Sequence, residues 1–452
     1  MSTEQQSEQE IRQQEIANLR RDGIVPFEYK YDVTSSIAEV LKKYEGLQVE
    51  EEAKDKLSLA GRIIARRGHG KAQFGNLMDD SGTIQYYAKL DLLGDGPYAL
   101  LERLNTGDFI GIEGVAFRTK RGELSIKIEK LTLLTKTIAP LPEKYHGLTD
   151  KELRYRYRYL DLIANPQVKD VFRKRSEIIR LIREFLHKQG FVEVETPVLQ
   201  TVAGGAAARP FVTHHNALDM DLSLRISHEI PLKKLIVGGF EKVYELGKAF
   251  RNEGISYKHN PEYTLMELYQ AYTDYEGMME LMEEICSYLV HQLYGTHVIQ
   301  YQGQTVDFTT PWPRVEYTEI NLDEFEEKTI RPTFLVNYPK AESPLAKPHR
   351  SRADIVERFE VVCCGMEIAN AYSELSDPLD QRERFMDQAR QRAAGNEEAT
   401  MMDEEFVKAL EHGLPPTGGL GIGIDRIVMI LTDQASVRDV ILFPHMREKQ
   451  ES

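Results

Sequence analysis

The spacing of apolar and polar residues changes about a third of the way along the chain. From residue 57 to residue 135, apolar residues alternate with polar ones in short runs that end at turn residues, a pattern typical of strands. The pattern predicts five strands, at 58–65, 74–78, 84–87, 109–117 and 124–134. A helical stretch near 97–104 interrupts them. Beyond residue 150, longer runs with helical spacing alternate with strand-like runs, which predicts a second, larger domain of the α+β class.

Five short strands and one helix fit a small Greek-key barrel of the OB type, which we place at residues 55–136. Such barrels commonly bind single-stranded nucleic acid on aromatic side chains. Residues 57–130 hold eleven basic and nine acidic residues, although the whole chain carries a net charge of -15. The barrel is therefore the place to expect nucleic acid. On pattern alone, Phe74 fits a core position as well as a base-stacking position.

Three other regions complete the domain organisation. Residues 1–54 form an N-terminal extension whose first 22 residues predict a helix with a sparse apolar face of Ile11, Ile16 and Leu19. That helix is expected to need a partner surface, either RNA or protein. Residues 137–150 contain prolines and predict a stiff linker. Residues 151–160 are rich in arginine and tyrosine and predict one helix, for which we favour an interdomain surface over an RNA-facing one.

Composition limits the function classes. No apolar run reaches the roughly 20 residues that a membrane-spanning helix needs, and residues 1–14 are polar, so we expect a cytoplasmic protein that does not associate with membranes. Cys286, Cys363 and Cys364 lack metal-ligand spacing and are expected to be reduced and structural. The acidic net charge argues against a protein that coats nucleic acid indiscriminately.

Four side chains of different chemistry gather between two strand-like runs, 242–246 and 263–269. Arg251, Glu253, His259 and Tyr263 bring a guanidinium, a carboxylate, an imidazole and an aromatic ring to one loop. A guanidinium can neutralise a phosphate with two hydrogen bonds, and a nearby carboxylate can accept from an adenine amine. The group indicates an ATP site. The alternative is a surface ion pair between Arg251 and Glu253 on an ordinary hairpin.

A glycine-rich run, 418–426, supplies a second phosphate signal. Its alternate glycines remove the side chains from one face of a strand, so a flat ligand can lie against the backbone. The run ends in Arg426 at the start of the apolar helix 427–431. The helix dipole disfavours a cation there unless an anion neutralises it, and a polyphosphate is such an anion.

These two patterns resemble motifs 2 and 3 of the class II aminoacyl-tRNA synthetases. A predicted helix at 168–190, followed by a strand at 191–197, resembles their motif 1, which forms the dimer interface in that family. Local strings at 204–211, 237–241, 266–269 and 370–375 resemble the lysyl enzymes of class IIb. The resemblance runs from about residue 57 to residue 446. It departs from the family between motifs 2 and 3, where residues 314–331 replace a helical insertion of several tens of residues.

The resemblance implies a lysine–tRNA ligase with an antiparallel-sheet catalytic domain at residues 151–452. Its substrates would be ATP, L-lysine and tRNA(Lys), its cofactor Mg²⁺, and its assembly a homodimer. The residues implied for catalysis are Arg251, Glu253, His259 and Arg426, and these four with Tyr263 would bind ATP. The residues implied for the amino-acid substrate are Gly205, Glu229, Glu267, Tyr269, Asn370, Tyr372, Glu374 and Gly421. The residues implied for the anticodon are Arg67, Phe74, Gln85 and Glu123.

Glu360 and Glu367 are the metal ligands that the resemblance implies. They are seven residues apart in one strand-like stretch, 359–368, and an odd spacing in a regular strand puts two side chains on opposite faces. The spacing alone therefore favours a structural role for at least one of the two. For both to bind metal, as the resemblance implies, a bend or bulge near Cys364 and Gly365 must bring the carboxylates together.

Two alternative functions use the same scaffold. One is a lysine-activating paralogue that passes lysine to an acceptor other than tRNA, and the predicted barrel argues against it. The other is a non-catalytic RNA-binding protein, and the complete set of ATP-site residues argues against that. His228 is not the residue expected beside Glu229, and we favour a packing role for it over a substitution that tunes the pocket.

Overall fold

The computed structural model describes residues 3–68, 70–141, 148–396 and 398–448, without the side chains of residues 3–6. The chain forms two compact units, Met1–Gly147 and Leu148–Ser452. The division lies within the stretch predicted as a linker, of which residues 142–147 lie outside the described residues, as do residues 1–2 of the predicted N-terminal extension. Each unit is described by itself.

The first unit is the predicted five-stranded barrel. Its strands close in the order β1-β2-β3-β5-β4. They are β1 (Glu52–Arg67), β2 (Ala72–Met78), β3 (Thr83–Lys89), β4 (Phe109–Arg118) and β5 (Leu124–Thr135). Within the described residues 3–68 and 70–141, four helices accompany them: α1 (Thr3–Arg21), α2 (Ile37–Lys43), α3 (Leu90–Leu93) and α4 (Asp95–Glu102). All five predicted strands and the predicted helix are present, so the sequence pattern identified this architecture correctly.

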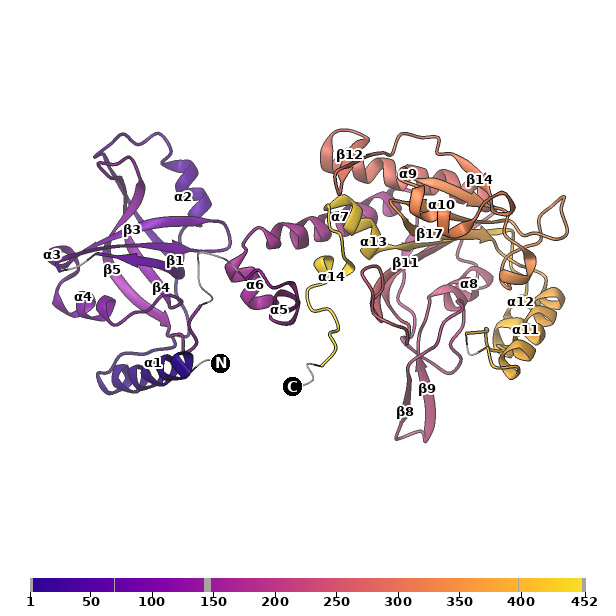
Figure 1. The fold of residues 1–452 in the computed structure, drawn as a ribbon, viewed down its shortest axis with the longest axis horizontal. Helices are drawn as coiled ribbons and strands as arrows, with labels where there is room; N and C mark the ends of the chain where they lie inside the picture. The colour runs from indigo at the N-terminus through magenta and orange to yellow at the C-terminus, as the bar shows by residue number, and fades with distance from the viewer. Residues whose placement is uncertain (1–2, 69, 142–147, 397, 449–452) are drawn as a thin grey trace. The chain divides into compact units, whose positions relative to one another are not determined.

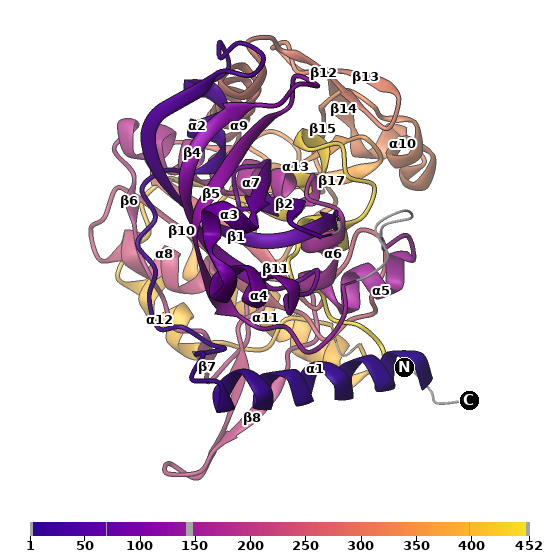
Figure 2. The same ribbon diagram turned by 90° about the vertical axis from the view of Figure 1, so that its left-hand side faces the viewer.

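The N-terminal helix α1 packs against its own barrel, across one end of it (Figure 1, Figure 2). Leu19 is fully buried and joins the barrel core, whereas Ile11 is exposed. Arg103, which follows α4, forms ion pairs with Glu15 at 2.6 Å and with Asp22 at 2.8 Å. The partner surface that the sparse apolar face needs is thus supplied by the same unit.

The second unit is built on one eight-stranded sheet, in the order β14-β15-β16-β17-β18-β11-β10-β6. Its inner pairs are antiparallel, and only the outermost pairs, β14 with β15 and β10 with β6, are parallel. The strands are β6 (Val192–Glu193), β10 (Lys242–Phe250), β11 (Glu262–Ala271), β14 (Arg314–Glu316), β15 (Thr333–Val336), β16 (Arg358–Cys363), β17 (Met366–Ser373) and β18 (Thr417–Gly423).

Smaller elements surround this sheet. Two small sheets contain β7 (Leu199–Gln200), β8 (Val212–His215) and β9 (Met220–Leu224), and β12 (Val298–Tyr301) with β13 (Gln304–Asp307). The helices are α5 (Lys151–Arg156), α6 (Arg158–Ala164), α7 (Val168–Lys188), α8 (Glu229–Val237), α9 (Tyr275–Tyr294), α10 (Leu322–Lys328), α11 (Pro378–Ala393), α12 (Glu404–Glu411), α13 (Ile424–Leu431) and α14 (Val437–Val440).

Strand alternation gives the sheet two different faces. Met266, Leu268, Leu420 and Ile422 point to a face covered by α7, α9 and α13, where they join the main core (Figure 1). Their neighbours in sequence point to the other face, which α8, α11 and α12 cover only in part. Because successive side chains of a strand alternate, the same strands fill the core and present polar groups on the second face.

The helix predicted to end at Gly190 is α7, and Gly190 follows it with φ +83°, a conformation that glycine adopts without strain. The strand predicted at 191–197 is shorter than expected, because regular pairing covers only Val192 and Glu193. The N–H of Val194 still donates to the carbonyl oxygen of Tyr244 in β10, and β6 lies at the edge of the sheet.

The segment at 151–160 differs from its prediction. It forms two short helices, α5 and α6, in place of one helix. Its Arg158 is buried within the second unit, where it pairs with Asp161 at 2.7 Å and donates to the carbonyl oxygens of Arg438 and Leu442. These contacts hold the C-terminal segment of the same unit.

The shortened segment, residues 314–331, forms a compact connection. Between β14 and β15 lie one 3₁₀ turn, Tyr317–Glu319, and the seven-residue helix α10. The side chain of Asn321 caps α10 by accepting from the backbone N–H of Glu324 at 3.3 Å.

Across the described ranges, every helix is too short or too polar to cross a bilayer.

Candidate active site

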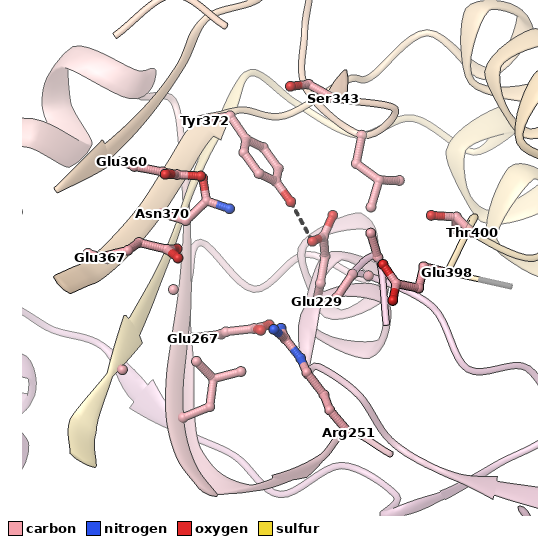
Figure 3. A pocket seen from close by; sticks show the side chains of 18 of the residues that line it. Glu229, Arg251, Glu267, Ser343, Glu360, Glu367, Asn370, Tyr372, Glu398 and Thr400 are labelled. Atoms are coloured by element: carbon pink, nitrogen blue, oxygen red, sulfur yellow. Dashed lines mark hydrogen bonds between the residues drawn. The ribbon is translucent and has the colours of Figure 1, made fainter. Parts of the chain in front are cut away.

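A cavity of about 600 Å³ opens on the sheet face that the core helices leave uncovered. Its walls come from the loop after β10, from β11, β16, β17 and β18, and from the start of α8. Fourteen of the fifteen residues predicted for the catalytic domain line it: Gly205, Glu229, Arg251, Glu253, His259, Tyr263, Glu267, Tyr269, Glu360, Glu367, Asn370, Tyr372, Gly421 and Arg426. The exception is Glu374, which lies behind the wall. Figure 3 shows Glu360 and Glu367 on one side of this space and Glu398 and Thr400 opposite.

The loop between β10 and β11 gathers cationic groups at one end of the cavity. The two strands pair from Lys242 with Gln270 to Phe250 with Glu262, so the predicted hairpin is present. The guanidinium of Arg251 lies 5.3 Å from the centre of the Tyr263 ring, and its buried Nε has no hydrogen-bond partner in the described part of the chain. A buried donor without a partner is a group that a ligand can satisfy.

Arg426 approaches the same loop from the glycine-rich strand. It lies in the first turn of α13, and its guanidinium is 3.3 Å from Nε2 of His259. Burial and the charge of Arg426 lower the pKa of His259, so this imidazole is neutral at pH 7. Two arginines and a neutral histidine therefore face one space, an arrangement suited to a polyphosphate.

A one-residue bulge brings Glu360 and Glu367 to the same face. The stretch 359–368 is a hairpin, in which Val361 pairs with Ala369 but Val362 pairs with Glu367. Ile368 is thus the extra residue, and the bulge lies there and not at Cys364 and Gly365, which form the turn. The expectation of a bulge was correct and its position was wrong.

Two carboxylates on one wall repel each other unless a cation or a proton intervenes. Burial and the neighbouring Glu367 raise the pKa of Glu360 to about 7. Among the described residues, no cluster of three or more His, Cys, Asp or Glu side chains could hold a metal ion. A pair of carboxylates nevertheless suits Mg²⁺, which takes its remaining ligands from water and phosphate.

Sequence reasoning missed Arg358, which organises this wall. Its guanidinium donates to Asn370 Oδ1 at 3.1 Å, to Glu360 Oε1 at 2.7 Å and to the hydroxyl of Ser343 at 3.0 Å. With its oxygen held by Arg358, Asn370 turns its amide nitrogen toward the cavity (Figure 3). The spacing contained a signal, because residues 358 and 360 share one face of a strand.

The opposite end of the cavity is acidic and buried. Glu229 accepts a hydrogen bond from the Tyr372 hydroxyl at 2.5 Å, and Glu267 accepts one from the backbone N–H of His228 at 3.0 Å. Burial and the neighbouring Glu229 raise the pKa of Glu267 to about 8. The ring of His228 is fully buried and burial lowers its pKa to about 3, so it packs there as a neutral group.

The carboxylate of Glu374 lies behind Gly419 at the edge of this acidic end. A Cβ atom at Gly419 would lie 2.0 Å from Glu374 Oε1 and 2.6 Å from the Tyr269 ring, so only glycine fits between them and the cavity. Oε2 of Glu374 pairs with the ammonium of Lys233, a residue that sequence reasoning missed. Oε1 has no hydrogen-bond donor in the described ranges.

Gly205 closes the acidic end from another loop. Its φ is +87°, and a Cβ atom there would lie 2.0 Å from the Ser227 hydroxyl and 2.8 Å from Cβ of Glu229. The close approach puts the backbone at Gly205 beside Glu229.

On the barrel unit, the four residues predicted for RNA lie on or beside paired strands. Arg67 pairs in register with Phe74, and Gln85 is buried and accepts from the Ser125 hydroxyl at 2.9 Å. Arg67 and Glu123 are exposed. Phe74 is half-buried and its ring lies 4.7 Å from that of Tyr87.

Tyr87 extends the aromatic surface of the barrel. Its ring lies 5.9 Å from that of Phe117, so Phe74, Tyr87 and Phe117 form a continuous row of half-buried rings. Sequence reasoning missed the last two, because their proximity depends on strand register. The row is a platform on which bases can stack.

Comparison with known proteins gives consistent matches along the whole chain. Residues 150–447 match the family described as tRNA synthetases class II (D, K and N), and residues 57–134 match OB-fold nucleic acid binding domains. The lysine–tRNA ligase of Moorella thermoacetica is 50% identical over 483 aligned residues, covering 98% of this chain and 98% of that protein. The lysine–tRNA ligase of Fervidobacterium nodosum is 51% identical over 477 residues, covering 97% of this chain and 94% of that protein. Both alignments are longer than this chain, so these relatives carry residues that it lacks.

Proposed function

Because this chain belongs to the class II tRNA synthetases, we propose that it is a lysine–tRNA ligase. It activates L-lysine with ATP to lysyl-adenylate and transfers the lysyl group to the 3′ end of tRNA(Lys). The observation that carries the choice of lysine is the buried acidic end of the cavity, where Glu229, Glu267 and Glu374 converge. A substrate with two ammonium groups supplies cations to this cluster of buried carboxylates, and an uncharged side chain would leave more of their charge uncompensated.

The lysine molecule spans the cavity between these groups. Glu229 and the backbone at Gly205 bind its α-ammonium, and Glu374 with Tyr269 binds its ε-ammonium. Asn370 donates its amide hydrogens to the substrate carboxylate, a role supported by the Arg358 hydrogen bond that fixes the amide orientation. Glu267, Tyr372 and Gly421 complete the walls around the aliphatic stem.

ATP occupies the cationic end. Tyr263 stacks on adenine, Glu253 accepts from the adenine edge, His259 approaches the outer phosphates and Arg426 binds the γ-phosphate. Arg251 bridges the lysine carboxylate and the α-phosphate. A carboxylate oxygen forms the new bond to the α-phosphorus as the bond to pyrophosphate breaks, so catalysis consists of alignment and charge neutralisation. Glu360 and Glu367 would hold Mg²⁺, which supplies further neutralisation of phosphate oxygens when bound.

Three further features belong to the same proposal. The barrel binds the uridine-rich anticodon of tRNA(Lys) through Arg67, Phe74, Gln85 and Glu123. A homodimer forms through α7 and the edge strand β6. The enzyme works in the cytoplasm.

Two reactions measured side by side test the function. The proposal predicts lysine-dependent exchange of pyrophosphate into ATP and lysine-dependent charging of tRNA(Lys) by the same preparation. Exchange without charging of tRNA would favour transfer to another acceptor. RNA binding without either reaction would favour a non-catalytic RNA-binding protein.

Phe74→Ala tests the barrel. Stacking of one base contributes about 1 to 3 kcal/mol, so we expect the KM for tRNA to rise about five- to a hundredfold while lysine-dependent exchange stays unchanged. The measurement is charging kinetics beside exchange kinetics. Tyr29→Ala is the matched control, because this aromatic of the same unit is fully exposed and lies outside the row of rings. An equal loss of exchange and charging would make Phe74 a core residue.

A further inference from the structure

An ammonium group, that of Lys233, is buried at the acidic end of the cavity and has no role in the chemistry above. Lys233 lies on α8, one turn beyond Glu229, and has no exposed surface. Its Nζ is 2.5 Å from Glu229 Oε1 and also pairs with Glu374 Oε2. It therefore joins the two carboxylates that the proposed function assigns to the two ammonium groups of lysine.

The surroundings of Lys233 exclude water. Nζ lies 5.6 Å from the centre of the Tyr372 ring and 5.7 Å from that of Phe406 on α12, both within cation–π range. Burial alone lowers the pKa of Lys233, but Glu229 and Glu374 outweigh it and raise the pKa above its ordinary value. The group stays charged at neutral pH.

The charges around the acidic end match one lysine molecule only when Lys233 is counted. Burial keeps Glu267 mostly protonated in the empty site, but the two ammonium groups of bound lysine favour the ionised carboxylate. In the lysine-bound site, the charges of Glu229, Glu267 and Glu374 exceed those of Lys233 and Arg251 by one negative charge. Free lysine carries two ammonium groups and one carboxylate, which is one net positive charge. Without Lys233 the site would keep two negative charges. Buried sites favour neutrality, because unpaired charge is poorly solvated there.

We propose that Lys233 is a positioning and specificity-determining residue of the lysine site. It holds the carboxylates of Glu229 and Glu374 in place, and it sets the net charge of the lysine-bound site to match lysine and not a dication of similar length. The inference rests on the proposed lysine–tRNA ligase function.

Lys233→Met removes the ammonium and keeps most of the volume. Loss of one partner of a buried charge pair predicts a rise of at least about tenfold in the KM for lysine, with the KM for ATP changed less than about twofold. Pentane-1,5-diamine, a dication without a carboxylate, should inhibit exchange more strongly relative to lysine, by about fivefold or more, because the variant site carries one more negative charge. Lys234→Met is the matched control. Lys234 is the neighbour of Lys233 on α8 and pairs with exposed Glu405, so this variant should change neither the KM for lysine nor the relative inhibition by the diamine.

The double variant Lys233→Met with Glu374→Gln separates charge matching from packing. It restores the original net charge of the site, so adding Lys233→Met to Glu374→Gln should change the KM for lysine less than about twofold. Two results would overturn the inference. One is a double variant whose KM for lysine rises by the product of the two single-variant increases. The other is an unchanged preference for lysine over the diamine in Lys233→Met.

Two controls keep the outcomes distinct. If thermal unfolding shows that Lys233→Met alone does not fold, the test is the KM for lysine of the folded double variant compared with that of Glu374→Gln. A double variant that also fails to fold overturns the inference, because Lys233 is then required whatever its charge partner. A parent protein without lysine-dependent exchange contradicts the proposed function itself, and the variants are compared only with an active parent.

Discussion

Arg251→Gln should lower lysine-dependent pyrophosphate exchange by about a hundred- to a thousandfold, since removal of one preorganised group that stabilises transition-state charge has that effect. Arg251 stands between the acidic lysine end and the phosphate end, and its buried Nε has no partner within the described part of the chain. Glutamine keeps a hydrogen-bond donor but carries no charge. It therefore cannot offset the charge that builds up as the substrate carboxylate approaches the α-phosphate.

The measurement is the rate of exchange at saturating ATP and lysine, with thermal unfolding to verify the fold. Arg390→Gln is the matched control, because this arginine lies on α11 with its side chain 75% exposed and paired with Asp387. The assignment fails if Arg251→Gln retains more than about a tenth of the parent rate, a smaller loss than removal of such a group produces.

The polarity of individual strands was predictable, because alternation is a local property. Residues 263–269 alternate so that Met266 and Leu268 enter the core while Glu267 and Tyr269 face the cavity. The same rule could not settle which face Glu360 and Glu367 share. The face that Glu367 occupies depends on the bulge at Ile368, and a bulge is set by pairing with the neighbouring strand, which the spacing of one strand does not contain.

Buried charged groups were the hardest to predict. Glu229 and Lys233 are four residues apart on a helix, a spacing that commonly marks a solvent-exposed ion pair. Only the packing of α12, β10 and β11 against α8 buries that pair beside the cavity. The role of Arg358 was not predictable for the same reason, because its hydrogen-bond partners Asn370, Ser343 and Glu360 come from three separate segments of the chain. The length of β6 likewise depends on its pairing with β10, and the packing of α1 depends on the barrel core that Leu19 joins.

Glu374→Gln should raise the KM for lysine at least tenfold and leave the KM for ATP nearly unchanged, because loss of a buried charged partner is worth about 2 to 5 kcal/mol. Glu374 lies behind Gly419 at the wall of the cavity. Its Oε1 accepts no hydrogen bond from the described residues, and its Oε2 forms an ion pair with Lys233. The variant removes the charge at the ε-ammonium end and leaves Arg251, His259 and Arg426 untouched.

Steady-state exchange kinetics with lysine and ATP varied separately would measure this effect. Glu405→Gln supplies the control, since this carboxylate on α12 is exposed and pairs with Lys234 outside the cavity. Equal lysine activation by Glu374→Gln and the parent would remove Glu374 from the ε-ammonium site. Selectivity would then rest on Glu229 and Glu267, which both line the acidic end of the cavity.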